Sequence, residues 1–267
     1  MRSACSQYDA GDTGIRPNGP TAGYCLKRKE CMSSRFFTTS IDHTAQTATL
    51  EDSEAHHLLH VMRLKPGEQV TLFDGMGNSW TAVITGTSRR SAELSLVEQI
   101  STASHGGHEI ILAVAPPKGD RFRWLVEKAT ELGMDTLIPV ETERTVVSPG
   151  SGKLDKLQQT MVAACKQCGR NQFMKFEPPI SWQQCVDQYR NSHTILIAHP
   201  NGDHLRDAFR EIEPTRHLLL AVGPEGGFTE EEVAIALRAG AEQVSLGTNL
   251  LRTETAAITF AAAARLW

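Results

Sequence analysis

The chain of 267 residues is long enough for one large domain or two smaller ones with a substantial core. Hydrophobic residues make up 40% of it and charged residues 22%, and its longest apolar runs, 110–117 and 218–222, are far shorter than the roughly 18–20 residues of a membrane-spanning helix. These values exclude a transmembrane protein. Six irregularly spaced cysteines and the lack of a signal-peptide pattern exclude a small disulfide-stapled secreted scaffold and predict a cytoplasmic protein with reduced thiols.

The charge of the chain gives a mixed indication about nucleic-acid binding. Its 27 Lys and Arg residues against 31 Asp and Glu residues give a formal net charge of -4, which argues weakly against such a partner. The central segment 109–187 nevertheless balances 10 basic residues against 10 acidic ones. A local basic face there is compatible with structured RNA, although a solvated helix face is the plainer interpretation.

The first hundred residues divide into an extension and a small β domain. Residues 1–34 are rich in small and polar residues without a hydrophobic period, which predicts a disordered N-terminal extension; Met32 is a candidate physiological start. Short alternating runs over 35–100 predict strands from Arg35 onward, with one helix near 52–63. The further strands expected are 47–50, 69–73, 79–85 and 92–98, with a hairpin turn over 74–78. Residues 101–108 have no period and predict a linker.

The remainder, 109–267, alternates strands with helices. The expected strands are 110–115, 136–140, 194–198, 217–222 and 243–246. The expected helices are 122–132 and 154–168, each followed by a glycine, a third that begins after a capping box of Thr229 and Glu232 and ends at Gly240, and the alanine-rich 253–266. This alternation predicts an α/β fold with a mostly parallel sheet and helices on both faces.

Two glycine-bearing loops follow strands in this second part, 223–229 and 246–255. Open parallel sheets place ligand sites at the carboxyl ends of their strands. Glycines let the backbone approach a ligand closely, and free amides and carbonyls can bind an adenine edge or a ribose. Either loop alone also suits an unliganded turn. Together they predict a two-domain α/β protein with a site for a nucleotide-like ligand.

The same loops resemble the SPOUT class of RNA methyltransferases, and within it the ribosomal RNA small subunit methyltransferase E family. The resemblance covers nearly all of 35–267. It is carried by an ordered set of segments: 35–37, 57–63 with Gly67, 72–75, 118–121, 128–133, Gln167 with Gly169 and Arg170, 223–229, Leu246 with Gly247, and 251–256. Each segment is a weak signal by itself, whereas the ordered set is highly specific.

The resemblance implies a PUA-like, RNA-binding β-barrel domain over 35–100 and a SPOUT methyltransferase domain over 109–267, the latter with a C-terminal trefoil knot. It implies a homodimer whose site lies near the subunit interface, S-adenosylmethionine as the cofactor, and N3 of a uridine in 16S ribosomal RNA of the small ribosomal subunit as the methyl acceptor. No metal and no membrane are implied.

The resemblance also places the cofactor in three loops. The cofactor-binding residues it implies are Ala198, His199, Pro200, Val222, Gly223, Pro224, Glu225, Gly226, Gly227, Leu246, Gly247, Asn249, Leu250, Leu251, Arg252, Thr253 and Thr255. The family usually has a basic residue at the position of Asn249, so one contact near the substrate or cofactor is expected to be weaker here.

Three charged residues are the catalytic candidates. Methyl transfer from a sulfonium is an in-line displacement, and uracil N3 carries a proton that must be removed, or the charge developing on O2 and O4 must be stabilised. Arg252 is the candidate for charge stabilisation; a salt bridge or a subunit contact is its plainer role. Glu225 and Glu254 are candidates for the base or for positioning, and Glu254 equally suits the N-terminal dipole of the last helix.

RNA contacts are expected from cations and one amide. The residues concerned are Arg35, Arg63, Lys118, Arg121, Arg170 and Asn171, and His57 is a further candidate for the RNA face. The family usually has an acid where this chain has Lys166, which is expected to add positive charge beside Arg170.

The remaining patterns favour structural roles. Two alternative functions also stay open. Cys165 and Cys168 are predicted to be core-facing helix thiols, His56 and His60 to share a helix face without a metal, and 150–153 to form a turn that leads into a helix. The rival functions are a non-catalytic RNA-binding or ribosome-assembly factor and a knotted methyltransferase that acts on another RNA position, such as a ribose 2′-hydroxyl or a transfer RNA.

Overall fold

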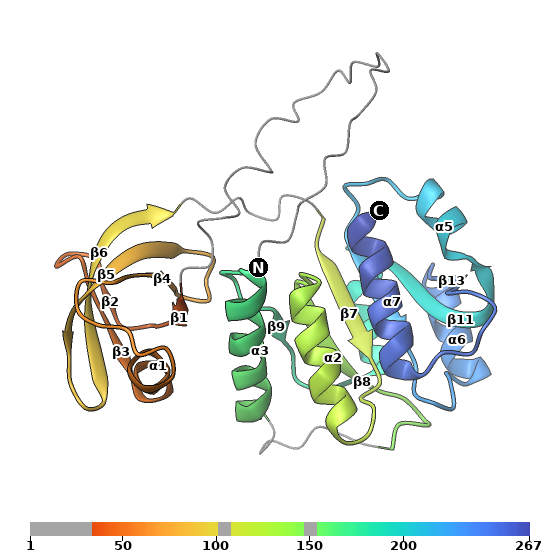
Figure 1. The fold of residues 1–267 in the computed structure, drawn as a ribbon. Helices are drawn as coiled ribbons and strands as arrows, with labels where there is room; N and C mark the ends of the chain where they lie inside the picture. Colours follow the sequence, from red (N-terminus) through yellow and green to blue (C-terminus); the bar gives the residue numbers. More distant parts are fainter. Residues whose placement is uncertain (1–33, 101–107, 147–153) are drawn as a thin grey trace, which may run out of the picture. The chain divides into compact units, whose positions relative to one another are not determined.

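The computed structural model describes residues 34–100, 108–146 and 154–267, which contain two β-sheets with their helices (Figure 1). Most of the predicted extension (1–33), most of the predicted linker (101–107) and the predicted turn 150–153 lie outside the described residues. Within the described ranges, no helix is long and apolar enough to cross a membrane.

The first sheet has six strands in the order β1-β4-β5-β6-β3-β2. They are β1 (Arg35–Phe37), β2 (Ile41–Asp42), β3 (Thr47–Glu51), β4 (Gln69–Phe73), β5 (Ser79–Thr87) and β6 (Ser91–Ile100). β1 pairs with β4 in parallel, and the other pairs are antiparallel. The predicted turn joins β4 to β5, where Asp74 Oδ1 accepts hydrogen bonds from the amides of Met76 (2.7 Å) and Asn78 (3.1 Å).

The predicted helix of this first part lies between β3 and β4. It consists of α1 (Asp52–His56) and the π-helical turn η1 (His57–Val61), and the rings of His56 and His60 lie 4.9 Å apart on one face as expected. Ala55 and Leu58 are fully buried against Phe36 and the inward residues of the strands. This sheet and its helix, residues 35–100, are called the β domain below.

The second sheet is parallel throughout, in the order β10-β8-β7-β12-β11-β13 with β9 also paired to β8. Its strands are β7 (Ile110–Val114), β8 (Thr136–Glu141), β9 (Lys175–Phe176), β10 (Ile180–Ser181), β11 (Thr194–His204), β12 (Leu218–Val222) and β13 (Glu242–Ser245). β7 and β12 are buried along their whole length. Sheets covered on both faces have such continuous apolar strands, because alternate side chains point to opposite layers.

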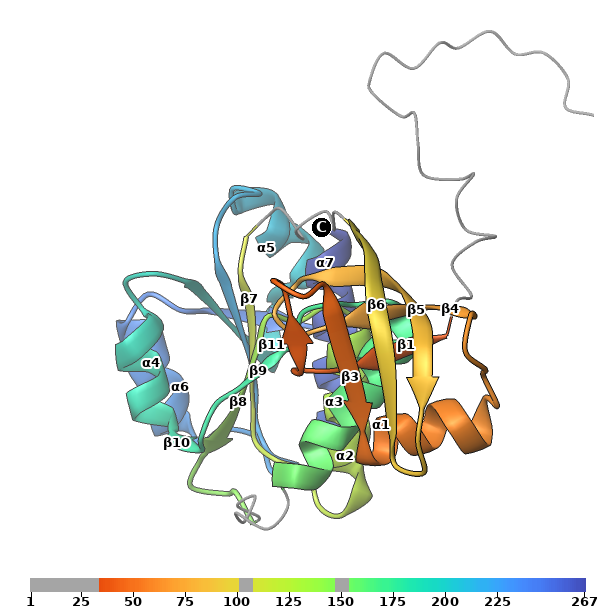
Figure 2. The same cartoon turned by 90° about the vertical axis from the view of Figure 1, so that its left-hand side faces the viewer.

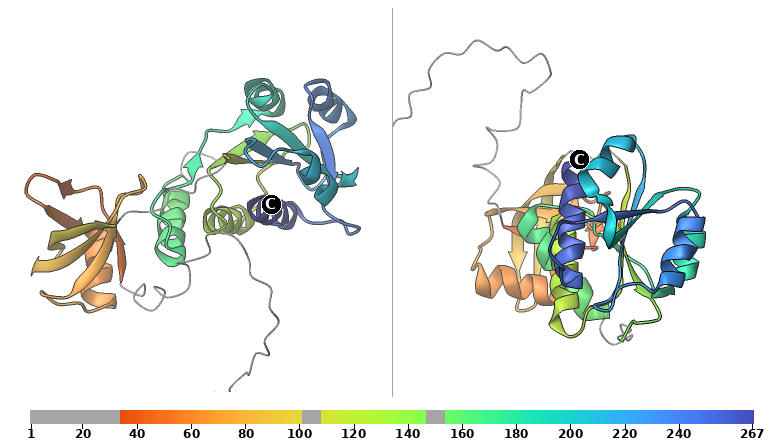
Figure 3. Two further views of the ribbon diagram at one scale, coloured as in Figure 1. Left: turned by 90° about the horizontal axis from the view of Figure 1, so that it is seen from above. Right: turned by 90° about the vertical axis from the view of Figure 1, so that its right-hand side faces the viewer.

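Helices cover both faces of this sheet, as predicted (Figures 2 and 3). On one face lie α2 (Asp120–Glu131), α3 (Leu154–Cys168), α5 (Leu205–Glu211) and α7 (Thr253–Leu266), and on the other lie α4 (Trp182–Tyr189) and α6 (Glu230–Arg238). Leu112 of β7 belongs to the first core and its neighbour Ile111 to the second. Each such fully buried aliphatic side chain contributes roughly 1.5–3 kcal/mol to folding.

Several elements were not predicted, and one prediction about cysteines is wrong. No hydrophobic period indicated β2, β9, β10, α4 or α5, because their lengths of 2–8 residues are too short for one to develop. Cys165 is buried, and burial raises the pKa of its thiol to about 12, but Cys168 is exposed. Residues three apart lie on the same side of an α-helix, but Cys168 is the last residue of α3 and lies beyond its last buried position, Cys165.

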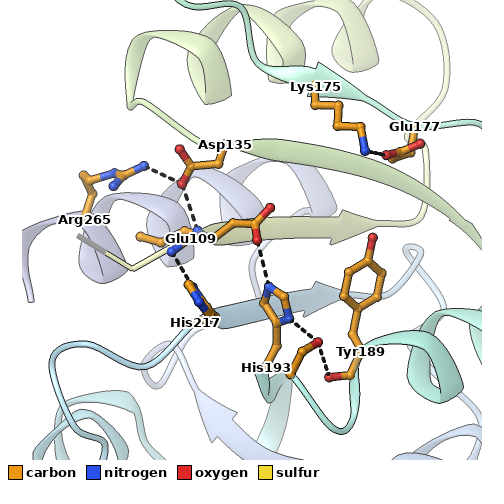
Figure 4. A network of polar contacts seen from close by, with 10 residues as sticks. Glu109, Asp135, Lys175, Glu177, Tyr189, His193, His217 and Arg265 are labelled. Carbon is orange, nitrogen blue, oxygen red and sulfur yellow. Dashed lines mark hydrogen bonds and ion pairs between the residues drawn. The ribbon is translucent and has the colours of Figure 1, made fainter. Parts of the chain in front are cut away.

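The amino ends of β7, β11 and β12 are joined by a polar network (Figure 4). His193 is only 6% exposed, with Nε2 3.4 Å from Glu109 Oε2 and Nδ1 2.8 Å from Ser192 Oγ. The amide of Glu109 donates to Nδ1 of His217, 2.9 Å away. Burial lowers the pKa of His193 below its ordinary value of 6.5, and His217 and Arg216 lower it further, against the opposing effect of Glu109.

We therefore expect His193 to make folding stability depend on pH below about 6.5. The unfolded imidazole binds a proton at its ordinary pKa whereas the native one resists protonation, so stability present above pH 6.5 is lost as the pH falls toward the lowered native pKa, by about 1.4 kcal/mol for each unit of lowering. His193→Gln should flatten this decline in urea unfolding, while the exposed control His60→Gln should not. Equal slopes for His193→Gln and the wild type would contradict the assignment.

Candidate functional site

A cavity of about 770 Å³ opens at the carboxyl ends of β11, β12 and β13. Its lining residues are Arg144, Ala198, His199, Pro200, Gly202, His204, Val222, Gly223, Pro224, Glu225, Gly226, Gly227, Phe228, Ser245, Leu246, Gly247, Thr248, Asn249, Leu250, Leu251, Thr253 and Ala256. The three loops to which a cofactor was assigned thus meet in one cavity. Arg252 and Thr255 of the predicted set are not among the residues that line it.

The first wall of the cavity is an excursion within β11. Ala198 and Asp203 both pair with Val244 of β13, so residues 199–202 leave the strand and return to the same place. The excursion closes at Gly202, where an added Cβ would lie 2.5 Å from the amide nitrogen of Val244 and 2.6 Å from the carbonyl carbon of Gln243. Only a residue without a side chain permits this approach of two backbones.

The second wall is the loop between β12 and α6. Gly227, at φ +70°, closes a turn by donating its amide to Pro224 O over 2.8 Å. The predicted capping box is present, with the Thr229 hydroxyl accepting from the Glu232 amide and the Glu232 carboxylate from the Thr229 amide. Glu232 Oε1 also accepts from the amide of Glu143, which fixes this loop to the segment after β8.

The third wall connects β13 to α7. Gly247 has φ +127°, and Ser245 Oγ donates to its carbonyl over 3.1 Å. At the far end, Thr253 Oγ1 donates to Gly223 O over 3.2 Å, which joins the third wall to the second. Between these anchors Leu250 is 89% exposed while it lines the cavity.

Sequence reasoning missed Arg144, which lies in the segment after β8. Its Nη1 donates to Gly226 O over 2.6 Å, and among the described residues that line the cavity it is the one arginine or lysine. A signal was available. Arg144 follows the end of β8 by three residues, and the carboxyl ends of parallel strands share one edge of the sheet.

Arg121 brings the two predicted acids together beside the cavity. Its Nη1 lies 3.9 Å from Glu225 Oε1 and its Nε 3.7 Å from Glu254 Oε1. Glu254, in the first turn of α7, is 8% exposed, and its Oε2 is buried without a hydrogen-bond partner in the described part of the chain. Arg252 is the exposed N-cap residue of α7 and takes part in no ion pair with another described residue.

The structure corrects the RNA-binding role of Arg170. It is 8% exposed, and its Nη1 donates to the carbonyls of Met134 (2.8 Å) and Thr130 (3.3 Å), so it cannot present its guanidinium to a phosphate. Arg35 and Asn171 are hydrogen-bonded to each other, and Asn171 also donates to Ser79 Oγ over 3.2 Å.

The expectation for Lys166 is also wrong, because it forms an ion pair with Glu54 instead of adding charge beside Arg170. His57 is half-buried against Phe36, and its contact with RNA stays a prediction. Arg63 and Lys118 are exposed, and their contact with RNA stays a prediction.

Comparison with known proteins gives consistent matches. A family described as "RNA methyltransferase domain" matches residues 105–265, and one described as "RNA methyltransferase PUA domain" matches 50–97. Ribosomal RNA small subunit methyltransferase E of Synechocystis is 31% identical over 79% of this chain and 70% of its own length, and that of Bacillus subtilis is 28% identical over 79% and 87%. The crystal structure of this enzyme from Neisseria gonorrhoeae bound to S-adenosyl methionine is 34% identical, with a TM-score of 0.79 over 88% of this chain and 98% of that one.

The close approach at Gly202 leads to a stability prediction. We expect Gly202→Ala to lower the free energy of unfolding by about 1–3 kcal/mol, because the methyl group would force β11 and β13 apart. Gly86→Ala is a matched control, since its Cβ would meet only Glu93 side-chain atoms at 3.4 Å or more. Urea unfolding should leave this control within about 0.5 kcal/mol of the wild type. Equal stability of the two variants would contradict the account of the excursion.

Proposed function

Because the chain belongs to the RNA methyltransferase family of ribosomal RNA small subunit methyltransferase E, we propose that it methylates N3 of a uridine in 16S ribosomal RNA. The coarser activity, S-adenosylmethionine-dependent methylation of 16S ribosomal RNA, follows from family membership. The observation that carries the proposal on the structural side is the meeting of the three predicted cofactor loops in one cavity.

The residues of the cavity fit S-adenosylmethionine. A volume of about 770 Å³ is within the usual range for a small-molecule site, and glycines in all three walls let peptide groups approach a nucleoside closely. Arg144 offers a positive group for the carboxylate of the cofactor. When bound, S-adenosylmethionine supplies an electrophilic methyl group on its sulfonium.

The chain's part in the reaction is to prepare the acceptor. A uracil held beside Glu225 has a carboxylate available for its N3 proton, and Arg252 at the N-terminus of α7 stabilises the negative charge that develops on the ring oxygens. Arg121 holds Glu225 and Glu254 in place through its two long ion pairs. The unpartnered Oε2 of Glu254 suits a positioning hydrogen bond better than a surface role.

RNA binding is assigned to the β domain together with an exposed cation near the cavity. The match to an RNA methyltransferase PUA domain supports the role of the β domain, and the exposed Lys118, two residues before α2, is the cation that we assign to the RNA near the cavity. Arg121 is instead assigned to Glu225 and Glu254, which it faces. N3 is hidden in a paired base, so the target uridine must be unpaired or flipped out.

Several finer features remain part of the proposal. We assign residues 35–100 to the RNA-binding domain, 109–267 to a knotted methyltransferase domain, 1–34 to an extension and 101–108 to a linker, and we assign the protein to the cytoplasm and its substrate to the small ribosomal subunit. The homodimer that the family resemblance implies is likewise part of the proposal.

The experiment that tests the function is methyl incorporation from labelled S-adenosylmethionine into small ribosomal subunits that lack the modification, followed by nucleoside mass analysis. We expect N3-methyluridine. Detection of a methylated ribose or of another methylated base would show that the acceptor is not uridine N3. A lack of methyl incorporation despite calorimetric binding of the cofactor would show that the substrate is another RNA or another assembly state. Absence of cofactor binding would favour a non-catalytic RNA-binding factor.

Arg252→Ala should lower kcat by about 10²–10³-fold, the usual loss when a group that stabilises developing charge is removed. Its melting temperature should stay at the wild-type value, since the side chain is exposed and outside the described ion pairs. Single-turnover methylation and thermal melting measure the two effects. Wild-type turnover with an unchanged melting temperature would refute this role for Arg252.

Arg144→Ala should raise the Kd of S-adenosylmethionine roughly 10-fold or more, because a hydrogen bond from a charged group contributes about 1.5–3 kcal/mol and shapes the loop at Gly226. Arg210→Ala, which removes an exposed ion pair with Asp207 on α5, is the control and should leave the Kd unchanged. Titration calorimetry distinguishes the two. The same Kd in both variants would exclude Arg144 from the cofactor site.

A further inference from the structure

A partly buried ion pair joins the β domain to the end of α3. Lys166 Nζ lies 2.9 Å from both carboxylate oxygens of Glu54, and the two side chains are only 17% and 16% exposed. Exposed ion pairs contribute little, but burying two charges is costly unless both are fully hydrogen-bonded. Because burying these charges costs free energy, the pair is better explained by a role in fixing the contact between the two parts than by a gain in stability.

Each member of the pair has further partners on the β-domain side. Glu54 Oε2 also accepts the amide of Phe37 over 3.0 Å. Lys166 Nζ lies 5.1 Å from the centre of the Phe36 ring and 3.2 Å from His57 Nδ1. Burial and Lys166 lower the pKa of His57, which keeps its imidazole neutral and able to accept from the ammonium group. The charges of Glu54 and Lys166 are therefore fully hydrogen-bonded only when the β domain and α3 have this relative orientation.

A second set of contacts follows directly along the chain. Residues 166–173, called the docking segment here, meet the turn between β4 and β5. Gly77 donates its amide to Asn171 O (3.1 Å), and Phe173 donates its amide to Gly75 O (2.8 Å). The Phe173 ring lies 4.9 Å from the Phe37 ring, centre to centre. Backbone hydrogen bonds and ring packing thus define the same orientation as the ion pair.

The docking segment is equally fixed on its other side. Arg170 donates to the carbonyls of Thr130 and Met134 where α2 ends. α2 begins near the cavity, where Arg121 faces Glu225 and Glu254. The docking segment therefore contacts one end of α2, and the residues that we assign to the reacting base lie at the other end. Because α2 is a rigid element, a fixed position at one end fixes the other.

We propose that Glu54 and Lys166 are positioning residues that fix the RNA-binding face of the β domain relative to the cavity, so that one RNA contacts both. This inference rests on the proposed function. It assigns substrate positioning to two residues outside the cavity. RNA held at two points that are fixed relative to each other binds more tightly than at two points joined loosely, because the second contact has a high effective concentration.

The measurable consequence is a split between KM and kcat. With the pair broken, the KM for small subunits or a target RNA fragment should rise about 10-fold or more. The kcat at saturating RNA and the Kd of S-adenosylmethionine should stay at their wild-type values, because neither residue lines the cavity. A merely structural role would lower kcat, cofactor binding and RNA binding together.

Charge reversal gives the sharpest test. Lys166→Glu and Glu54→Lys each place two like charges together, and the double variant Glu54→Lys/Lys166→Glu restores an attractive pair. We expect each single variant to raise the KM for RNA and the double variant to recover part of the loss. Asp207→Arg/Arg210→Asp on the surface of α5 is the control and should change nothing. Lys166→Met, which keeps the stem over Phe36, serves if either reversal fails to fold.

The outcomes separate the two proposals. A wild-type KM in both single reversals, or in Lys166→Met, would overturn the positioning role, as would parallel losses of kcat and cofactor binding. Absence of methylation by the wild-type protein would count against the proposed function alone; the positioning role would then be judged by the Kd for the RNA fragment, which the single variants must raise and the double variant must partly restore. Failure of the wild-type protein to bind the fragment would overturn the inference.

Discussion

The parallel pairing of β11 with β12 on one side and β13 on the other is the constraint on which the rest of the site depends. Because Ala198 and Asp203 share one partner on β13, the residues between them have to leave the sheet, and Gly202 has to accept direct backbone contact. The same pairing places the loops after β12 and β13 beside the excursion. A cavity with three walls from one edge of the sheet is the consequence, and it needs no contribution from the core beyond holding the strands together.

The amino and carboxyl ends of the strands in this sheet have different polar environments. At the amino ends, backbone and side-chain polar groups contact one another, and the nearly buried His193 lies between Glu109 and Ser192. At the carboxyl ends, glycine loops leave peptide groups facing a cavity, and one carboxylate oxygen of Glu254 is buried without a hydrogen-bond partner among the described residues. His193 Nε2 at the amino ends is likewise without a hydrogen-bond partner there, so Glu254 is distinguished by its place beside the cavity, where a bound substrate can supply the missing donor.

Periodicity was enough to predict the elements whose packing is regular. The helices α2, α3, α6 and α7 and the long strands repeat apolar residues over 4–15 positions, and their end signals, Gly133, Gly169 and Thr229, act locally. Arg170 was misjudged because its partners are two carbonyls 36 and 40 residues away, and no local pattern distinguishes such an arginine from one that faces RNA. Lys166 was misjudged for the same reason, since its partner Glu54 lies 112 residues away in the other domain. The family resemblance, not the residues alone, supplied the cofactor and the substrate.

The pairing of cations constrains how an acidic protein binds RNA. Arg35, Arg170 and Lys166 are used between or inside the domains, and Arg121 faces two carboxylates. Phosphate contacts are thereby limited to exposed cations such as Lys118 and Arg63, and each contributes affinity without sequence information. On the proposed function, the β domain holds the RNA while a uridine enters the cavity, so recognition of that base depends on the distance and angle between the two. The same proposal requires a rigid contact between the two parts, and the partly buried ion pair of Glu54 with Lys166 is the contact to which we assign that role.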